Sequence, residues 1–448
     1  MRVTKKPLVI DLKKEENGTY TLDFATFKMY DVSESEFPSL CYPFILGGEK
    51  IEVHADTEEN FYKFVECTNR NGRAKYFFEP DNPALQNYLI NYMNCHGKYD
   101  SMALKGFLKG KPILFIGAGS SLRENIDIVR YAVKSGAYFS VCGGTAIHLC
   151  DQYGIYPDMA LGLDPHAHEH DRFKHLSEEF QSRVVLYAGS YLESRSFNNY
   201  KGTVIVQRGF ETFNIHTFLE PDLDQLIDEG DIGVSTWLPN LAEYWEAGEV
   251  HYIGCDLCYH VDGTEYGKDQ EKFFKDKTEQ RYEFQGKATR HNWVLECEQL
   301  GEYTKKFSHR RFINHSGGLT IEGWDEQSPA SLHLPRGNLD SITIPLKKIN
   351  IRGRRAKLKK LANEFKEILD NYPKFSTDSN AYKHILHGYE ILMMHYWIKD
   401  GLFNHSQLYL VSLRLHELIN KVLKGMKQLD RRHIRPSPYT PLKDYRNG

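Results

Sequence analysis

The stretch ILFIGAGSSLRENIDIVRYAVKSG, residues 113–136, decides the fold. An apolar run leads into the turn Gly117-Ala118-Gly119-Ser120-Ser121, and behind it apolar residues recur at helical spacing, at Leu122, Ile126, Val129 and Val133. This order predicts a strand, a tight turn and an amphipathic helix. We expect the helix to begin at Ser120 or Ser121, with a capping box between Ser121 and Glu124.

The turn is a candidate phosphate site. Gly117 and Gly119 allow a ligand to approach the backbone closely, and the N–H groups and dipole of a first helical turn favour an anion. A turn that uses glycine only for its conformational freedom is the alternative. Leu122 stands where a nicotinamide fingerprint needs glycine, and residues 142–145 offer no carboxylate for a ribose. A hydride-transfer enzyme is therefore disfavoured, and a P-loop is excluded because no Gly-Lys-Ser/Thr follows.

Similar apolar runs follow along the chain, separated by helical patterns, at residues 138–143, 159–164, 184–189, 203–207 and 250–257. They predict an α/β fold in which a Rossmann-like, mostly parallel sheet forms a central domain over residues 99–330. Short β-like runs and turns predict a small α+β region over residues 1–98. Residues 345–448 carry apolar residues at helical spacing, which predicts a helical C-terminal domain.

The composition is that of a globular protein, and a length of 448 residues favours two or three domains. A net charge of -3 makes nucleic acid an unexpected partner. No apolar run is long enough to span a membrane and the first residues lack a signal-peptide pattern, so we expect a cytoplasmic location. The charge run Lys347–Lys360 is expected to be a solvated helix face.

Eight cysteines are scattered along the chain, which is typical of reduced thiols in a large protein. Cys255 and Cys258 form a CxxC pair, for which redox chemistry or zinc binding is the alternative interpretation. No second pair at zinc-finger spacing accompanies it.

Asp164 stands at the expected carboxyl end of a strand, where ligands bind in open parallel sheets. It is a candidate Mg²⁺ ligand, or a partner of a substrate hydroxyl, or merely a turn residue before Pro165. His166, His168 and His170 alternate behind it, so an extended backbone would place three imidazoles on one face. A metal cluster, a general base and simple solvent exposure are the three interpretations.

The same edge of the sheet collects the other candidates. We predict catalytic roles for Asp164, His166, His168 and Asp256. The predicted nucleotide-binding residues are Gly117, Ala118, Gly119, Ser120, Ser121, Gly143, Thr145, Ser235 and Thr236.

Several blocks in order carry a family resemblance: IGAGSSL, YPDMALGLDP, GVSTW, YIGCDLCY and INHSGGLTIEGW. Together they resemble the domain shared by motility accessory factor (Maf) flagellin glycosyltransferases and archaeal 6-hydroxymethylpterin diphosphokinase MptE-like proteins. The first block also resembles the Gly-x-Gly-Pro-Ser-Leu loop of bacterial CMP-sugar sialyltransferases, with Ser120 in place of proline. The Asp-Pro and Gly-x-Asp-Leu patterns fall on Asp164 and Asp256.

The resemblance implies one of two activities. The first is transfer of a nonulosonic acid from a CMP donor to a protein Ser/Thr or a glycan, with a flagellin-like protein as the acceptor. The second is Mg²⁺-dependent diphosphate transfer to a pterin-like alcohol, with Asp164 and Asp158 or Asp256 holding the metal. A non-catalytic nucleotide-binding protein is a third hypothesis. Donor, acceptor, metal dependence and the identity of the base stay open at this level.

Overall fold

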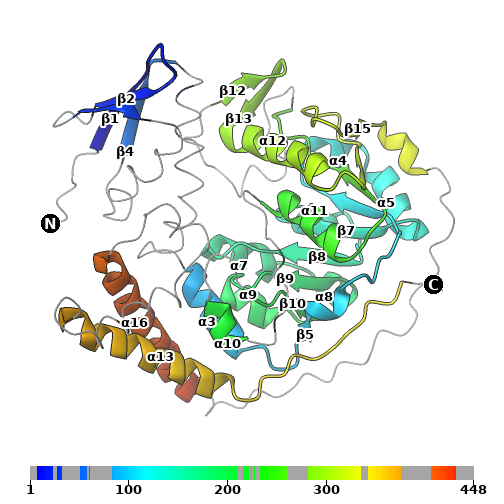
Figure 1. Ribbon diagram of the computed structural model, residues 1–448. Coiled ribbons are helices and arrows are strands. Elements are labelled where there is room, and N and C mark those ends of the chain that lie inside the picture. Colours follow the sequence, from blue (N-terminus) through cyan, green and yellow to red (C-terminus); the bar gives the residue numbers. More distant parts are fainter. Residues whose placement is uncertain are drawn as a thin grey trace.

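The computed structural model describes residues 8–23, 28–32, 51–57, 60, 83–209, 215–220, 223, 227, 233–260, 281–333, 342–374, 383 and 405–429. A large α/β layer, a small N-terminal sheet and a pair of C-terminal helices make up this part of the chain (Figure 1). Among the described helices, none is long and apolar enough to cross a membrane.

The central sheet has nine strands, and every pairing in it is parallel. Its order is β15-β14-β11-β6-β7-β8-β9-β10-β5. The strands are β5 (Tyr99–Asp100), β6 (Ile113–Ile116), β7 (Phe139–Gly143), β8 (Met159–Gly162), β9 (Val185–Ala188), β10 (Val204–Val206), β11 (Glu249–Ile253), β14 (Arg311–Asn314) and β15 (Asp325–Glu326). The predicted α/β fold is confirmed, including all six strands expected from apolar runs.

Both faces of the sheet are covered, as the apolar runs require. Ile113 and Phe115 of β6 face one core, which α11 (Val234–Tyr244) and α12 (His291–Lys306) cover. The alternate residues of the same strand face a second core under α5 (Ile126–Ser135), α6 (Ala146–Gln152), α7 (Ala167–Lys174), α8 (Glu178–Arg183) and α9 (Ser194–Asn199).

The order of the strands reverses between β6 and β11. From β6 the chain adds strands on one side as far as β10, and it then returns to place β11 on the other side of β6. In open α/β sheets, ligands bind beside such a switch point, at the carboxyl edge of the sheet. The glycine-rich turn follows β6 directly, so it lies at this switch point.

The N-terminal sheet has four strands in the order β3-β2-β1-β4. They are β1 (Leu8–Lys14), β2 (Tyr20–Asp23), β3 (Lys28–Val32) and β4 (Ile51–Ala55). One of the short β-like runs from which this region was predicted, at residues 74–78, lies outside the described residues. Within the predicted region 1–98, α3 (Ala84–Met93) packs instead against the C-terminal helices and α9.

Two long helices form the described part of the C-terminal region, α13 (Arg354–Asn371) and α16 (His405–Leu429). Both were expected from helical spacing, and they pack together through a core that includes Leu358, Phe365 and Ile419. The charge run Lys347–Lys360 is helical only from Arg354 onward; before it the chain runs without helix.

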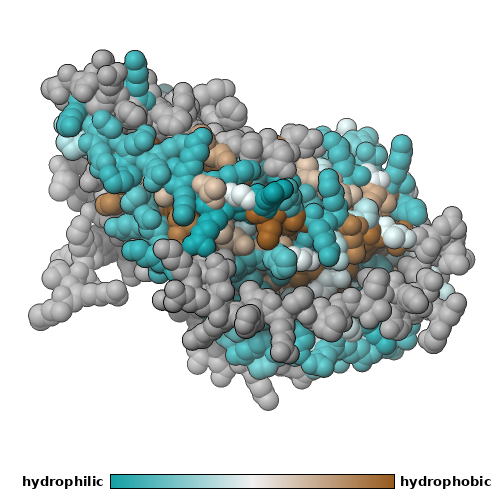
Figure 2. All heavy atoms as spheres, turned by 90° about the horizontal axis from the view of Figure 1, so that it is seen from below, coloured by the Kyte–Doolittle hydropathy of each residue, from teal (hydrophilic) through white to brown (hydrophobic). Residues whose placement is uncertain are grey.

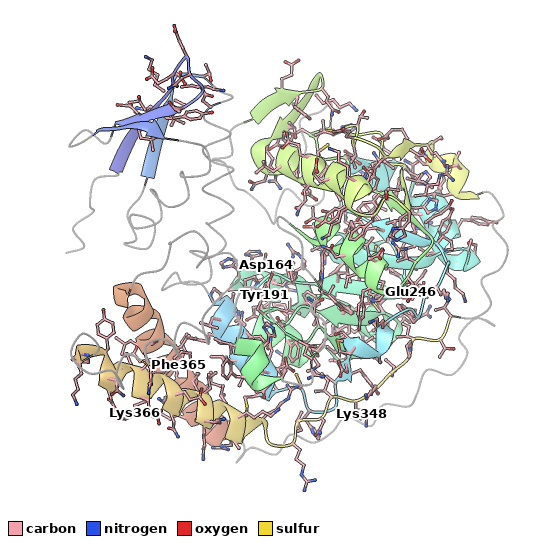
Figure 3. The ribbon with its side chains drawn as sticks, viewed as in Figure 1. Asp164, Tyr191, Glu246, Lys348, Phe365 and Lys366 are labelled. Carbon is pink, nitrogen blue, oxygen red and sulfur yellow. The ribbon has the colours of Figure 1, made fainter. Side chains whose placement is uncertain are left out.

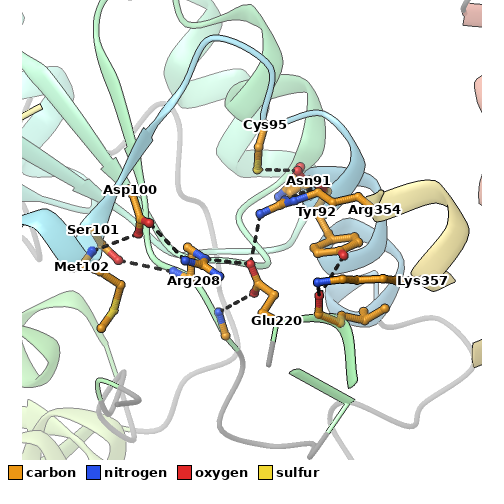
Figure 4. A network of polar contacts seen from close by, with 12 residues as sticks. Asn91, Tyr92, Cys95, Asp100, Ser101, Met102, Arg208, Glu220, Arg354 and Lys357 are labelled. Carbon is orange, nitrogen blue, oxygen red and sulfur yellow. Dashed lines mark hydrogen bonds and ion pairs between the residues drawn. The ribbon is translucent and has the colours of Figure 1, made fainter. Parts of the chain in front are cut away.

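A buried network of charges docks α13 on the α/β domain (Figure 4). Glu220, which follows α10 (Ile215–Leu219), accepts from Arg208 Nε at 2.9 Å and from Arg354 Nη2 at 3.1 Å. Arg208 Nη1 donates to Asp100 Oδ2 at 3.1 Å. Two cations and two carboxylates balance each other, so the network carries no net charge into the interior.

Substituting Glu220→Gln should lower the free energy of unfolding by about 3 kcal/mol, because Arg208 and Arg354 would stay buried without their shared carboxylate. Chemical denaturation measures the loss. Lys366→Gln, which breaks an exposed pair with Asp370, is the control and should cost less than about 0.5 kcal/mol. Equal losses for the two variants would contradict the prediction.

Candidate functional site

The glycine-rich turn joins β6 to a short helix, α4 (Ser120–Glu124). The helix begins at Ser120, as expected, and Gly119 is its N-cap. The expected capping box is wrong, because Ser121 lies inside the first turn and no side chain caps the helix. The Ser121 hydroxyl is engaged elsewhere, by a residue far along the chain.

The glycines of the turn are required by a contact within the protein. A Cβ atom on Gly117 would lie 2.3 Å from the carbonyl oxygen of Gly254, and one on Gly119 would lie 2.6 Å from Cγ of Asp256. Gly254 has a φ of +77°, which L side chains rarely adopt. The two loops at the switch point therefore touch through their backbones, and only glycine fits there.

Asp256 binds the turn from the neighbouring loop. Its carboxylate accepts from the Ser121 N–H at 2.9 Å and the Ser120 hydroxyl at 3.2 Å, and also from the Ser121 hydroxyl. Asp256 is only 6% exposed, and burial raises the pKa of its carboxyl while the bonds from Ser121 lower it. The N–H groups of Ala118 and Ser120 have no hydrogen-bond partner among the described residues, so they are the donors left for a ligand.

Asp164 follows β8 and lies at the same carboxyl edge. One carboxylate oxygen accepts from the His166 N–H at 2.8 Å, and the other lies 2.6 Å from Nε2 of His168. The side chain of His168 is 50% exposed, so this pair is open to solvent.

The expected row of three imidazoles is wrong. The backbone behind Asp164 is not extended, because α7 begins at Ala167 and carries His168 and His170 on helical spacing. Of the three, His166 and His168 have stacked rings, with their centroids 5.8 Å apart.

Glu169 is a residue that sequence reasoning missed. It is buried on α7 and forms an ion pair with Arg172. Burial raises the pKa of Glu169 to about 7, the Arg172 charge opposes this shift, and the nearby Asp164 charge adds to it. The Glu-x-x-Arg spacing on a helix was the available signal, but spacing does not reveal burial.

The other predicted binding residues lie at the same edge, and the hydroxyl groups of Ser235 and Thr236 are bonded within the protein. Thr236 Oγ1 lies 2.9 Å from the Gly233 carbonyl at the start of α11, and the Ser235 hydroxyl donates to Glu296. A Cβ on Gly143 would lie 2.4 Å from Cγ1 of Val234. Thr145 is the N-cap of α6 without a side-chain bond. These positions hold α11 over the end of β7.

The structure does not bring the three aspartates predicted as Mg²⁺ ligands together at one edge of the sheet. Asp164 and Asp256 each use both carboxylate oxygens in hydrogen bonds, and Asp158 precedes β8 and bonds to Ser140 at the opposite, amino edge. In the described ranges, no group of three or more His, Cys, Asp or Glu residues could hold a metal ion. The metal role given to Asp158 from sequence is therefore wrong.

Six cysteines fall within the described residues, and all six are free thiols, as expected. In the CxxC pair, burial raises the pKa of both Cys255 and Cys258. Cys255 packs against the turn, because its sulfur would lie 2.7 Å from a Cβ atom on Gly117. Zinc and reactive thiols use the thiolate, which this environment disfavours.

Comparison with known proteins agrees with this architecture. Residues 86–262 match the family model described as 6-hydroxymethylpterin diphosphokinase MptE-like. The structure is similar to that of MAf glycosyltransferase from Magnetospirillum magneticum AMB-1, with a TM-score of 0.53 and 13% sequence identity, over 89% of this chain and 68% of that one. No curated protein matches the chain. The suspected resemblance is thus confirmed for the MptE-like domain and for the fold.

Glu169→Gln should remove a pH dependence of stability. Folding raises the pKa of Glu169 from 4.5 to about 7, so its stabilising contribution is complete below pH 4.5 and is lost as the pH rises through about 7. Between these limits, the unfolding free energy of the unaltered protein minus that of the variant should fall by about 3 kcal/mol. Denaturation at several pH values measures this difference; a constant difference would show that Glu169 titrates as it does in water.

Proposed function

We propose that the chain is a nucleotide-dependent transferase that moves a nonulosonic acid from a CMP donor to a hydroxyl group of a protein or glycan. The observation that carries the proposal is the hydrogen bond between Asp164 and His168 at the carboxyl edge of the sheet. The family match and the fold shared with a Maf glycosyltransferase support a transferase of this class.

The Asp164–His168 pair has the arrangement of a general base. With the Nε2 proton of His168 donated to Asp164, the Nδ1 lone pair is left to accept a proton. In the proposed reaction His168 takes the proton of the acceptor hydroxyl as its oxygen bonds to the anomeric carbon. The bond from that carbon to the phosphate oxygen breaks, and CMP leaves with the electron pair. Asp164 orients the ring and stabilises its charged form.

The turn after β6 is the proposed site of the departing phosphate. Gly117 follows β6 and Asp164 follows β8, two strands away, so the two sites are separated by roughly 10 Å at the edge of the sheet. A nucleotide phosphate bonded to the N–H groups of Ala118 and Ser120 would extend its sugar toward His168. Asp256 holds the turn in place and does not itself react.

Mg²⁺-dependent diphosphate transfer is the second candidate, and the description of the matching family favours it. Such a reaction needs carboxylates that converge on a metal between the phosphates. Asp164 and Asp256 follow separate strands, and their carboxylate oxygens accept hydrogen bonds within the protein. This arrangement supports the glycosyl-transfer proposal better than the diphosphate-transfer one.

A nucleotide screen tests the proposal and separates the candidates. CMP should raise the melting temperature without added Mg²⁺, by the equivalent of about 2.7 kcal/mol at a hundred times its Kd. CDP, UDP, GDP, ATP and GTP, each with and without Mg²⁺, are the comparison. A strict requirement for ATP with Mg²⁺ would favour diphosphate transfer, and no response to any nucleotide would overturn the assignment of the turn.

His168→Ala should lower kcat for release of CMP from a CMP-activated nonulosonic acid by about 10² to 10⁴, because the base is lost. The KM for the donor should stay within a few-fold, since the phosphate site is two strands away. His175→Ala is the matched control, because His175 is exposed at the end of the same helix. A kcat unchanged by His168→Ala would refute the assigned base.

A further inference from the structure

A strap of chain, residues 342–353, runs along the edge of the large sheet before α13 begins. The Asp100 N–H donates to the Lys347 carbonyl at 2.7 Å, and the Ile349 N–H donates to the Lys98 carbonyl at 3.0 Å. Lys348 forms an antiparallel bridge with Tyr99 of the edge strand β5, and Figure 3 shows it on the strap beyond the sheet. These bonds and the buried side chain of Ile349 hold the strap in a defined position.

The strap and the first turns of α13 are strongly basic. Between Lys347 and Lys360 the sequence has eight Lys and Arg residues and no Asp or Glu. Arg354 is buried in the Glu220 network, which leaves seven cations. Lys347, Lys348 and Arg352 are exposed and form no ion pair within the described part of the chain. Because the whole chain carries -3, this is a local concentration of positive charge.

Exposed apolar side chains lie among these cations. In the described residues only three large apolar side chains are strongly exposed, and two of them, Leu346 (41%) and Ile351 (36%), are on the strap. The third, Tyr131 (50%), lies on α5. Seen from below, the molecule shows apolar side chains among hydrophilic ones (Figure 2).

We propose that the strap and the start of α13 form a docking surface for a membrane that contains anionic phospholipids. Lys347, Lys348 and Arg352 would lie against the headgroups, where each cation strengthens binding by roughly fivefold. Leu346 and Ile351 would enter the boundary between headgroups and acyl chains. No spanning helix is needed for binding of this kind, so the chain would bind at the surface.

The apolar side chains favour a membrane over other polyanions. A nucleic acid would gain from the cations alone, since residues 342–353 contain no aromatic side chain on which a base could stack. An acidic protein would likewise leave Leu346 and Ile351 without an apolar partner. The surface lies at the β5 edge, five strand positions from β6, so the proposal does not depend on the transferase assignment.

Co-sedimentation of the full chain with vesicles tests the proposal. The chain should bind vesicles of phosphatidylcholine mixed with phosphatidylglycerol, and should not bind phosphatidylcholine alone. The triple variant Lys347→Gln/Lys348→Gln/Arg352→Gln should weaken binding by about 100-fold, at roughly fivefold for each cation. The double variant Leu346→Ser/Ile351→Ser should weaken binding to vesicles but leave binding to heparin unchanged.

Matched variants elsewhere on the surface serve as controls. Lys13→Gln/Lys134→Gln/Lys305→Gln removes three exposed cations from other elements, and Tyr131→Ser removes the remaining exposed apolar side chain. Both should bind vesicles as the unaltered chain does. The proposal would be overturned if the chain did not bind anionic vesicles at low salt, or if the strap and control variants lost binding equally. Binding to RNA or to an acidic protein without binding to vesicles would also overturn it.

Discussion

The buried carboxylate of Asp256 is the interaction on which the carboxyl edge of the sheet depends. It joins the loop after β11 to the turn after β6, the two loops between which the strand order reverses. A carboxylate removed from water needs several donors, and Ser120 and Ser121 supply them. Its own carbonyl accepts from the Leu319 N–H at 2.8 Å, which ties in the loop after β14 as well. Three loops from neighbouring strands are therefore fixed by one residue.

The contact with Asp256 gives the glycines of the turn a structural role that differs from the one predicted. From the sequence, Gly117 and Gly119 make room for a phosphate; in the structure, they make room for Gly254 and Asp256. The turn nevertheless keeps two N–H groups without a partner among the described residues, which are the donors proposed to hold a phosphate beside the carboxylate. Because burial raises the pKa of Asp256, the negative charge next to that anion is easier to neutralise than one on an exposed aspartate.

Sequence reasoning succeeded where the spacing of apolar residues alone determines whether a segment is a strand or a helix. The runs at residues 113–117 and 250–257 are apolar on both faces, which only a covered strand requires, and both are strands. It failed where contacts with distant parts of the chain determine the role of a side chain or the conformation of the backbone. Ser121 fits a capping box locally, yet it bonds to a residue 135 positions away. Histidines at every second position fit an extended backbone, yet His168 lies on a helix. The two-residue strands β5 and β15 are too short to leave a pattern.

The two aspartates at the edge differ because their surroundings differ. Asp256 is enclosed by donors from one turn and so fixes the backbone, whereas Asp164 shares its carboxylate between a backbone N–H and an exposed imidazole. Asp256 follows β11 and Asp164 follows β8, three strand positions away. A rigid group and an open one at separate strands suit the proposed reaction, in which one end of the substrate is held still while the acceptor at the other end loses a proton. The same separation disfavours a shared metal ion, since the ligands of one ion must meet at a single point. The proposal of glycosyl transfer therefore rests on the different surroundings of these two carboxylates.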